Sequence, residues 1–497
     1  MNEKIIVYGA GHYGRRCIKL AKQYGIEVLG VADRSLEMTG KDIEGYTVWE
    51  IERIRNQKAV IVISVADGWR DIKKELAERY SIREEYLGSF DEYWSKRLRE
   101  VLMSDEELFD SVFRRAQKED PTKRKIVLTS SQNEAFGGIE TWLLKTAQFL
   151  KGVGYDVSVI LLDSYDLIFS ENVHVIRVNM EYEKRKKERI ARYNIDTTRK
   201  LIVILAEMGS CVMISSRIDA FIDAAYFINA ILPDRICIQN VLHGGRSEYL
   251  QRAADISLQV DGYIGVSKEW ICKRMVEQYG IAAERVTYFT LPVEYEQSLT
   301  RSYSSIDEPI KIGFASRMTL NDPDKRVDYL IPLIRLLEKA GTEYILSIAG
   351  DGDYLDTLSE WVAKVHLSDR VLIKGRIPQK DMTEFWREQD IHISLSDSEG
   401  NSVTKLEAMA VGTVPIITDV SGARDAVDDG KNGFVVACGD IAEFAEKIRV
   451  LSKDRDLLKQ FGYESYKKIK EEYSKEATLA RLKDMRCFRI SFGEAGD

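Results

Sequence analysis

The sequence of 497 residues contains no apolar run that approaches the ~20 residues needed to cross a membrane as a helix. Its opening residues, MNEKIIVYGAGHYG, hold too short an apolar run for a secretory signal and fit a strand and a turn instead. The six cysteines form no CxxC pair, which argues against a zinc site or a disulfide framework and favours free thiols in a reducing compartment. We therefore expect a cytoplasmic protein.

The sequence also lacks a net positive charge and contains little proline. The net charge of −8 argues against a surface that binds nucleic acid, so we expect no nucleic-acid partner. There are only eight prolines, and short β-branched runs such as KIIVYG, KIVLTS and IKIGFAS alternate with segments of helical periodicity. Continuous apolar strands between helices are typical of parallel sheets covered on both faces, so the sequence predicts an α/β protein.

The length predicts about three domains, and the pattern of strands and charged segments places their boundaries. We predict a Rossmann-like domain at residues 1–92 and a helical linker at 93–124, where the sequence is charged and not rich in Gly or Ser. Two further α/β domains are expected at 125–302 and 303–455. The predicted C-terminal helices, 456–497, are expected to pack back on the 125–302 domain.

The segment DIHISLSDSEGNSVTKLEAMAVGTVPIIT suggests the chemistry of the third domain. It predicts a buried strand, a turn at EGNS and then a helix, with Asn401 or Ser402 as the N-cap and a stop at Gly412. A strand's carboxyl end, a Gly-containing turn and a helix N-terminus together favour the binding of a diphosphate. Such sites lie in the crevice outside the carboxyl ends of parallel strands.

Two carboxylates flank this predicted anion site. Glu399 precedes the helix and Glu407 lies eight positions on, which at ~1.5 Å per residue separates them by up to ~12 Å. One could hold a sugar's hydroxyls and the other a ribose diol, with the diphosphate between them. The alternative is that Glu399 is a solvated loop residue and Glu407 an exposed helix residue.

With its surroundings, this segment resembles the retaining GT-B glycosyltransferases of the large family four, whose signature is E-x7-E followed by A-M-A and a small residue. GFASR, ending in Arg317, and DKRVDYLI, with Lys325, are similar to the family's Arg/Lys pair that neutralises the donor diphosphate. SIAGDGDYLDTL, with Gly350, resembles its GDG turn, and VLIKGRIP, with Gly375, the strand before its nucleotide-base pocket. The resemblance covers about residues 310–450.

The resemblance implies a GT-B fold of two facing Rossmann-like domains and a nucleotide-sugar donor, with a UDP-sugar favoured. It assigns donor binding to Glu407, Gly350, Gly375 and the turn residues Gly400, Asn401, Ser402 and Val403, and catalysis to Arg317, Lys325, Glu399 and His243. Two departures are visible: NDPD lengthens the Arg-to-Lys gap, and Asp425 stands where the family often has Glu.

Asp351-Gly352-Asp353 has the form of the DxD metal motif of the other glycosyltransferase fold. It follows a predicted strand inside a block with the full GT-B pattern, so we expect no metal site and no cofactor for the transfer.

The second domain is expected to form the acceptor half. SSQNEAFGGIETWLL resembles the family's N-terminal glycine loop, with Gly137, Gly138 and Glu140, although a plain tight turn explains the glycines as well. His243, in VLHGG, stands where the family often has a histidine near the donor's anomeric carbon, whereas a lone histidine is usually structural. Ser267 matches a family serine, and N-capping explains it equally.

The run EKRKKERIARYN, residues 183–194, concentrates positive charge in an acidic chain. A solvated helix face is the simpler interpretation. The alternative is contact with anionic lipid headgroups or a phosphate-bearing acceptor, which would place the protein at the inner face of the membrane.

The first domain carries a dinucleotide fingerprint in the expected context. Gly9, Gly11 and Gly14 form GxGxxG between a predicted strand and helix, and Asp33 ends the next strand about twenty residues on. The block resembles small Rossmann domains of sugar-modifying enzymes, which bind a nucleotide-sugar in some and NAD in others. With no Tyr-xxx-Lys pair there, we favour a ligand-binding, docking or oligomerising accessory domain.

The leading hypothesis is a retaining glycosyltransferase acting on a glycan, a lipid-linked glycan, a polyol-phosphate polymer or a protein. One alternative is an NAD-dependent sugar oxidoreductase or epimerase acting through the first domain. Another is a non-catalytic GT-B-like subunit, which the intact charged residues of the third domain speak against.

Overall fold

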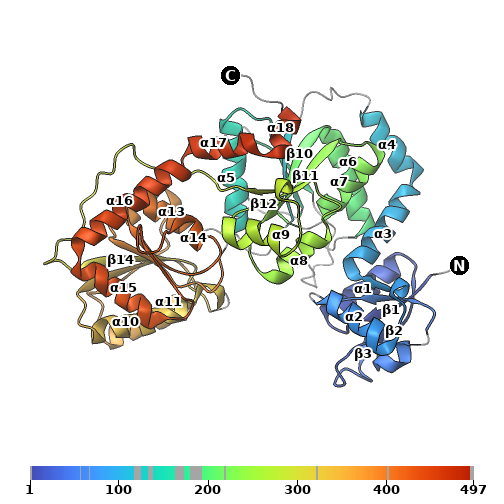
Figure 1. The fold of residues 1–497 in the computed structure, drawn as a ribbon, viewed down its shortest axis with the longest axis horizontal. Coiled ribbons are helices and arrows are strands. Elements are labelled where there is room, and N and C mark those ends of the chain that lie inside the picture. Colours follow the sequence, from blue (N-terminus) through green and yellow to red (C-terminus); the bar gives the residue numbers. More distant parts are fainter. Residues whose placement is uncertain are drawn as a thin grey trace. The chain divides into compact units, whose positions relative to one another are not determined.

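The structure is a computed structural model that describes residues 3–55, 57–65, 68–116, 125–131, 138–162, 169, 173–178, 193–217, 220–320, 323–399 and 402–492. The chain divides into two compact units, residues 1–240 with 247–262 and residues 241–246 with 263–497 (Figure 1). The described residues form three sheets. All six cysteines are free thiols.

The first sheet has the order β3-β4-β2-β1-β5-β6 and is parallel except for the β3–β4 pair. Its strands are β1 (Lys4–Tyr8), β2 (Glu27–Ala32), β3 (Asp42–Ile43), β4 (Tyr46–Trp49), β5 (Val60–Ile63) and β6 (Leu87–Ser89). Helices α1 (His12–Gln23) and α2 (Trp69–Tyr80) follow β1 and β5. The two strands beside β1 are β2 and β5, so its carboxyl end is a topological switch point, where α/β sheets bind ligands.

Two helices connect this sheet to the next. Helix α3 (Phe90–Met103) begins with a capping box between Ser89 and Glu92, and α4 (Glu106–Ala116) follows it. Both helices pack on α6 (Ile195–Met208) of the second sheet. An ion pair of 2.8 Å joins Arg199 Nε to Asp105 Oδ2, so the first sheet is held to the second within one unit.

The second sheet is seven-stranded, with the order β13-β12-β11-β10-β7-β8-β9. Its strands are β7 (Lys125–Ser131), β8 (Val157–Leu162), β9 (His174–Val178), β10 (Cys211–Ser215), β11 (Ile236–Leu242), β12 (Gly262–Gly265) and β13 (Val286–Tyr288). Its helices, besides α6, are α5 (Gly138–Gly152), α7 (Ala220–Ile231), α8 (Ser247–Asp255) and α9 (Arg274–Glu277). Strand β8 is buried at every position, as expected for a sheet covered on both faces.

Most of the basic run lies outside the described residues, since only Tyr193 and Asn194 of residues 183–194 are described. Tyr193 is buried, and its hydroxyl donates to Asp91 Oδ1 at 2.7 Å. Asn194 caps α6, accepting a hydrogen bond from Thr197 N at 2.9 Å. These two residues are therefore structural, and the prediction of a membrane contact stays a prediction for the rest of the run.

The third sheet has the order β16-β15-β14-β17-β18-β19 and is parallel throughout. Its strands are β14 (Ile310–Ala315), β15 (Tyr344–Ala349), β16 (Val371–Gly375), β17 (Ile391–Ser394), β18 (Val414–Thr418) and β19 (Phe434–Val436). Its helices are α10 (Leu330–Lys339), α11 (Tyr354–Lys364), α12 (Met382–Arg387), α13 (Val403–Ala410), α14 (Ala423–Ala426) and α15 (Ile441–Lys453).

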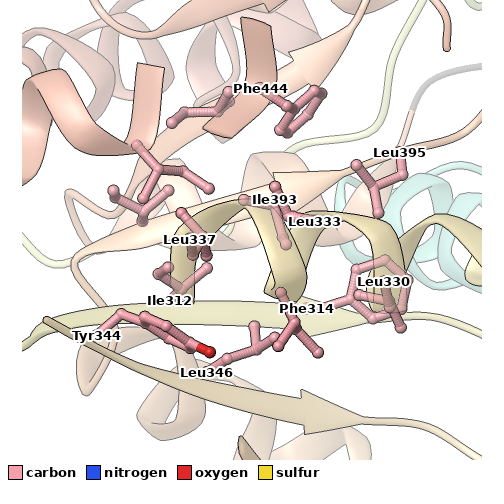
Figure 2. Packing of buried hydrophobic residues seen from close by; sticks show 14 of the residues in the cluster. Ile312, Phe314, Leu330, Leu333, Leu337, Tyr344, Leu346, Ile393, Leu395 and Phe444 are labelled. Atoms are coloured by element: carbon pink, nitrogen blue, oxygen red, sulfur yellow. The ribbon is translucent and has the colours of Figure 1, made fainter. Parts of the chain in front are cut away.

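Residues alternate between the two faces of this sheet, which fixes the helices on both sides. Ile312 and Phe314 of β14 lie in the apolar cluster with Leu333 of α10 (Figure 2). Gly313 between them packs against α12, because a Cβ there would lie 2.7 Å from the ring of Trp386. A central strand covered on both faces explains the continuous apolar run IKIGFA.

The chain ends in helices α16 (Arg455–Glu472), α17 (Lys475–Asp484) and α18 (Arg486–Phe492). The end of α16 packs along the segment before the third sheet. Val293 N donates to Tyr473 O at 2.9 Å, and the hydroxyl of Tyr466 donates to Glu296 O at 2.7 Å. Among the described residues, no helix combines the length and apolar character that a membrane span requires.

Candidate active site

The switch point of the third sheet lies between β14 and β17. From these two neighbours the order runs outward through β15 and β16 on one side and through β18 and β19 on the other. A ligand crevice forms outside the carboxyl ends of two such strands. The segment from Ser316 follows β14 and the segment from Leu395 follows β17, so both enter the crevice region.

An ion pair joins these two segments. Lys325 Nζ contacts Glu399 Oε1, and the two side chains are only 22% and 16% exposed. Ser396 Oγ donates to the same carboxylate oxygen at 3.1 Å. The topology therefore brings together two predicted catalytic residues that are 74 positions apart. Partial burial strengthens the attraction relative to a pair on the open surface.

The lengthened Arg-to-Lys loop is fixed to the segment after β17. Asp397 N donates to Asp324 O at 2.8 Å. Arg326, in the left-handed region with φ of 47°, contacts Asp397 at 2.6 Å and Asp328 at 2.9 Å. The residues on either side of Lys325, Asp324 and Arg326, are therefore both held to the segment after β17, while Asn321 and Asp322 of the insertion lie outside the described residues.

Glycines brace the segment that carries Arg317, which is itself exposed. A Cβ on Gly350 (φ 149°) would lie 1.9 Å from Ser316 O, and one on Gly352 (φ 147°) would lie 2.3 Å from Met318 O. Gly350 N also donates to Gly375 O at 2.9 Å. The GDG turn therefore supports the Arg317 segment by close backbone packing that a side chain would prevent.

Helix α13 begins at this site with Ser402 as its N-cap residue. The prediction that Asn401 or Ser402 is the N-cap residue is confirmed for Ser402, but the Ser402 side chain makes no cap hydrogen bond. Its hydroxyl lies 2.9 Å from Thr404 Oγ1 instead. No side chain of the described residues therefore caps the first N–H groups of α13, starting at Val403, and an anion is their natural partner. Gly400 and Asn401 lie outside the described residues.

Glu407 is partly buried on α13, where its Oε1 accepts a hydrogen bond from Gln379 Nε2 at 2.7 Å. The solvated alternative is wrong for Glu399, which is paired and largely buried, and Glu407 too has a polar partner. The described residues include no group of three or more His, Cys, Asp or Glu side chains that could hold a metal ion.

The sequence reasoning missed Lys405. This side chain is 2% exposed, and its ammonium donates to Gly422 O in the turn before α14. Burial lowers the pKa of Lys405 to about 8, although the carboxylates of Asp425 and Glu399 act to raise it. The only signal in the sequence was a lysine inside the otherwise apolar segment VTKLEAMA.

Lys405 predicts a pH dependence of stability. An unfolded chain keeps the lysine proton up to its ordinary pKa of 10.5, whereas the folded protein releases it near pH 8. Between these values the unfolded state binds more protons, so raising the pH favours the folded state. We expect the free energy of unfolding of wild type, relative to Lys405→Met, to rise by about 2 kcal/mol from pH 7.5 to 10. Denaturant titrations check this, and a constant difference would contradict it.

Asp425, on α14, follows the turn at Ser421 and Gly422, which we call the glycine turn. Its carboxylate accepts hydrogen bonds from Lys268 N at 2.8 Å and Glu269 N at 3.4 Å. Ser267 Oγ accepts from Trp270 N at 3.3 Å and from Gly422 N at 3.2 Å. Ser267 is therefore an N-cap, as one interpretation predicts, and it also accepts a hydrogen bond from the Gly422 backbone; a functional role for this serine stays a prediction.

His243 follows β11 and is partly buried. Three residues later, Arg246 Nη2 contacts Asp324 Oδ1 at 2.6 Å, so the His243 loop is tied to the loop of Lys325. In the second domain, Glu140 is buried on α5 and pairs with Arg217 Nη2 at 3.5 Å. Gly138 begins α5, and Gly137 lies outside the described residues.

The glycines of the first domain have three different environments. Gly9 has φ of 107°, which suits the tight turn after β1. Gly14 packs on it, because a Cβ there would lie 1.9 Å from Gly9 O. Gly11 is the N-cap of α1, and nothing lies within 4 Å of its added Cβ. A dinucleotide fingerprint requires one glycine for the tight turn, one that lets a phosphate approach the backbone and one for close helix packing. Gly9, Gly11 and Gly14 have these three environments in that order.

Asp33 braces this loop. Its Oδ2 accepts from Ala10 N at 2.7 Å and its Oδ1 from Ser35 N at 2.9 Å. Each carboxylate oxygen has a further lone pair, so a ribose hydroxyl can still be accepted.

Comparison with known proteins identifies the class of the third domain. Residues 298–468 match the family model described as glycosyl transferases group 1. Residues 1–86 match a second model, described as C2185-like, N-terminal. The predicted resemblance to glycosyltransferases is confirmed over residues 298–468, and the solved structures described next confirm the predicted GT-B fold.

Individual relatives are similar over part of the chain. A poly(ribitol-phosphate) alpha-N-acetylglucosaminyltransferase of Staphylococcus aureus is 30% identical over 173 residues, which cover 34% of each chain. A crystal structure of S. aureus TarM with UDP and alpha-GlcNAc-glycerol matches with a TM-score of 0.57 at 13% identity, over 73% of this chain and 99% of that one. A Rickettsia africae glycosyltransferase gives a TM-score of 0.60 at 17% identity, over 75% and 100%.

Proposed function

We propose that this protein is a retaining glycosyltransferase that takes a sugar from a nucleotide-sugar, with a UDP-sugar favoured. The observation that carries the proposal is the Lys325–Glu399 pair at the switch point of the third sheet, beside the uncapped start of α13. A cation and a helix N-terminus suit a diphosphate, and a carboxylate suits sugar hydroxyls. The bound UDP in the TarM structure supports the choice of donor.

In the proposed reaction the acceptor hydroxyl attacks the anomeric carbon on the face from which the diphosphate leaves. The new C–O bond forms as the bond to the diphosphate oxygen breaks, and the acceptor's proton passes to the leaving phosphate. Lys325, Arg317 and the first N–H groups of α13 stabilise the developing charge without a metal. Glu399 holds donor-sugar hydroxyls, Glu407 holds the ribose, and His243 lies near the anomeric carbon.

The acceptor is proposed by chemical class. A glycan, a lipid-linked glycan, a polyol-phosphate polymer or a protein would fit, and the similarity to a poly(ribitol-phosphate) enzyme supports the polymer. We place the protein in the cytoplasm, at the inner face of the membrane if residues 183–194 contact lipid. Self-association through the first domain is part of the same proposal.

A donor screen tests the function. The full-length protein is incubated with UDP-, GDP- and ADP-sugars, and release of nucleoside diphosphate is measured with and without acceptors. Release from one donor class, stimulated by an acceptor, is the expected result. Absence of release from every donor, together with reduction of NAD by a sugar nucleotide, would replace the proposal with the oxidoreductase alternative.

For the first domain we propose a nucleotide ligand, either NAD or a nucleotide-sugar, at the Gly9–Gly14 turn. Gly11→Ala is expected to change the free energy of unfolding by less than about 1 kcal/mol, since its Cβ meets nothing. Gly14→Ala is expected to cost about 3 kcal/mol or more, since its Cβ collides with Gly9 O. Thermal unfolding checks both values.

Calorimetry with NAD and UDP-sugars on wild type and Gly11→Ala then tests the ligand. We expect at least one nucleotide to bind, and its affinity to fall about tenfold in Gly11→Ala because the methyl group obstructs the phosphate approach. Equal binding by the two proteins would mean that the crevice is not the site.

A further inference from the structure

Lys405 is a buried cation inside the helix that forms the donor site. It is the third residue of α13 and lies six positions after Glu399. Lysine is almost never fully buried without a partner, because its charge is costly to remove from water. Here the described partner of the ammonium is a single backbone oxygen, that of Gly422. The free-energy cost of burying this ammonium suggests that its charge has a function.

The charges around Lys405 come from three segments. Glu399, after β17, and Asp425, on α14, both stabilise the ammonium. His392 of β17 is also close, but burial and the charge of Lys405 lower its pKa to about 3, so it is neutral. Lys405 is therefore a buried ammonium in electrostatic interaction with two carboxylates, one of which is the partner of Lys325.

The proposed function gives Lys325 two competing partners, Glu399 and the donor's diphosphate. Lys325 neutralises Glu399 in this structure, yet the proposed function needs Lys325 for the diphosphate. Once Lys325 turns to the diphosphate, Glu399 would be a partly buried carboxylate without its partner, close to further negative charge. Uncompensated charge of this kind is strongly unfavourable.

We propose that Lys405 is a positioning residue of the transfer site, which balances the charge of Glu399 while Lys325 is engaged by the donor's diphosphate. The same side chain holds the glycine turn, because Gly422 accepts from Lys405 and donates from its N–H to Ser267 Oγ. Lys405 thus holds the carboxylate of Glu399 in place for the sugar hydroxyls, from a position that does not itself touch the donor. The inference rests on the proposed function.

Lys405→Met tests the inference, with Lys364→Met on the exposed end of α11 as the matched control. We expect kcat for transfer to fall about 30-fold in Lys405→Met, whereas the affinity for UDP, which lacks the sugar, changes by less than about threefold. The melting temperature should stay within about 2 °C of wild type or rise, since a buried ammonium is replaced by an apolar side chain of similar volume. Lys364→Met should match wild type throughout.

A purely structural role would lower the melting temperature, UDP affinity and kcat together, and that result would overturn the inference, as would an unchanged kcat. A double-mutant cycle with Glu399→Gln gives the second readout. If Lys405 acts through the charge of Glu399, the double variant is about as active as Glu399→Gln alone. If the fold-losses of the two single variants instead multiply in the double variant, the two residues act independently and the inference is contradicted. Failure of the proposed function is distinguishable, because wild type would then release no nucleoside diphosphate from any donor.

Discussion

Lys325→Ala is expected to lower kcat/KM for the nucleotide-sugar by about 10³-fold. The lysine is the cation that this structure places at the switch point, and removing one preorganised stabiliser of a developing anion costs about 10²–10³-fold. The rest of the loss comes from Glu399, which is left partly buried without its ion-pair partner. Initial rates of nucleoside diphosphate release measure the effect.

Two comparisons make this prediction specific. Glu399→Gln should keep much of the affinity for UDP, because Lys325 and Arg317 still bind the diphosphate. Its kcat should fall, because the contact between residue 399 and the sugar hydroxyls is altered. Lys325→Arg should recover part of the activity, since the charge is kept while the geometry changes. A Lys325→Ala protein that releases nucleoside diphosphate at the wild-type rate would exclude the pair as the centre of the reaction.

Gly350→Ala is expected to destabilise the second unit by about 4 kcal/mol. The new Cβ would lie 1.9 Å from Ser316 O, in a backbone conformation with φ of 149° that L side chains rarely adopt. The neighbouring atom is backbone, so relief requires the Arg317 segment to move. Denaturant unfolding measures the loss, and UDP affinity should fall with it.

Gly375→Ala is the matched control for this prediction. Gly375 also has a positive φ, 65°, but nothing lies within 4 Å of its added Cβ. It should cost only about 1 kcal/mol, the usual penalty for the left-handed region. Equal costs for the two variants would show that close packing of the GDG turn on Ser316 is not what holds the Arg317 segment.

The alternation of strands and helices was predictable because parallel strands buried on both faces leave continuous apolar runs, as in IKIGFA. Strand β17 and helix α13, on either side of Glu399, also followed from local sequence patterns. The Lys325–Glu399 contact was not available locally, because it depends on β14 and β17 being neighbours in the sheet. The family resemblance supplied it instead.

Lys405 shows where sequence reasoning fails. A lysine in a helix is normally assigned to solvent, whereas the packing of α13 against α16, α12, β17 and β18 leaves Lys405 buried. Ser402 shows the opposite failure, since a good N-cap residue leaves the helix uncapped by turning to Thr404. Both departures from local preference lie at the proposed donor site, where function is expected to outweigh propensity.

The most direct test of the account is a structure of the full-length protein with a UDP-sugar bound. The account predicts the diphosphate at the start of α13, within hydrogen-bond distance of Lys325 and Arg317. The Lys325–Glu399 contact should be opened, and Glu399 should face the sugar. A donor found only at the Gly9–Gly14 turn of the first domain, with the Lys325–Glu399 pair undisturbed, would contradict it.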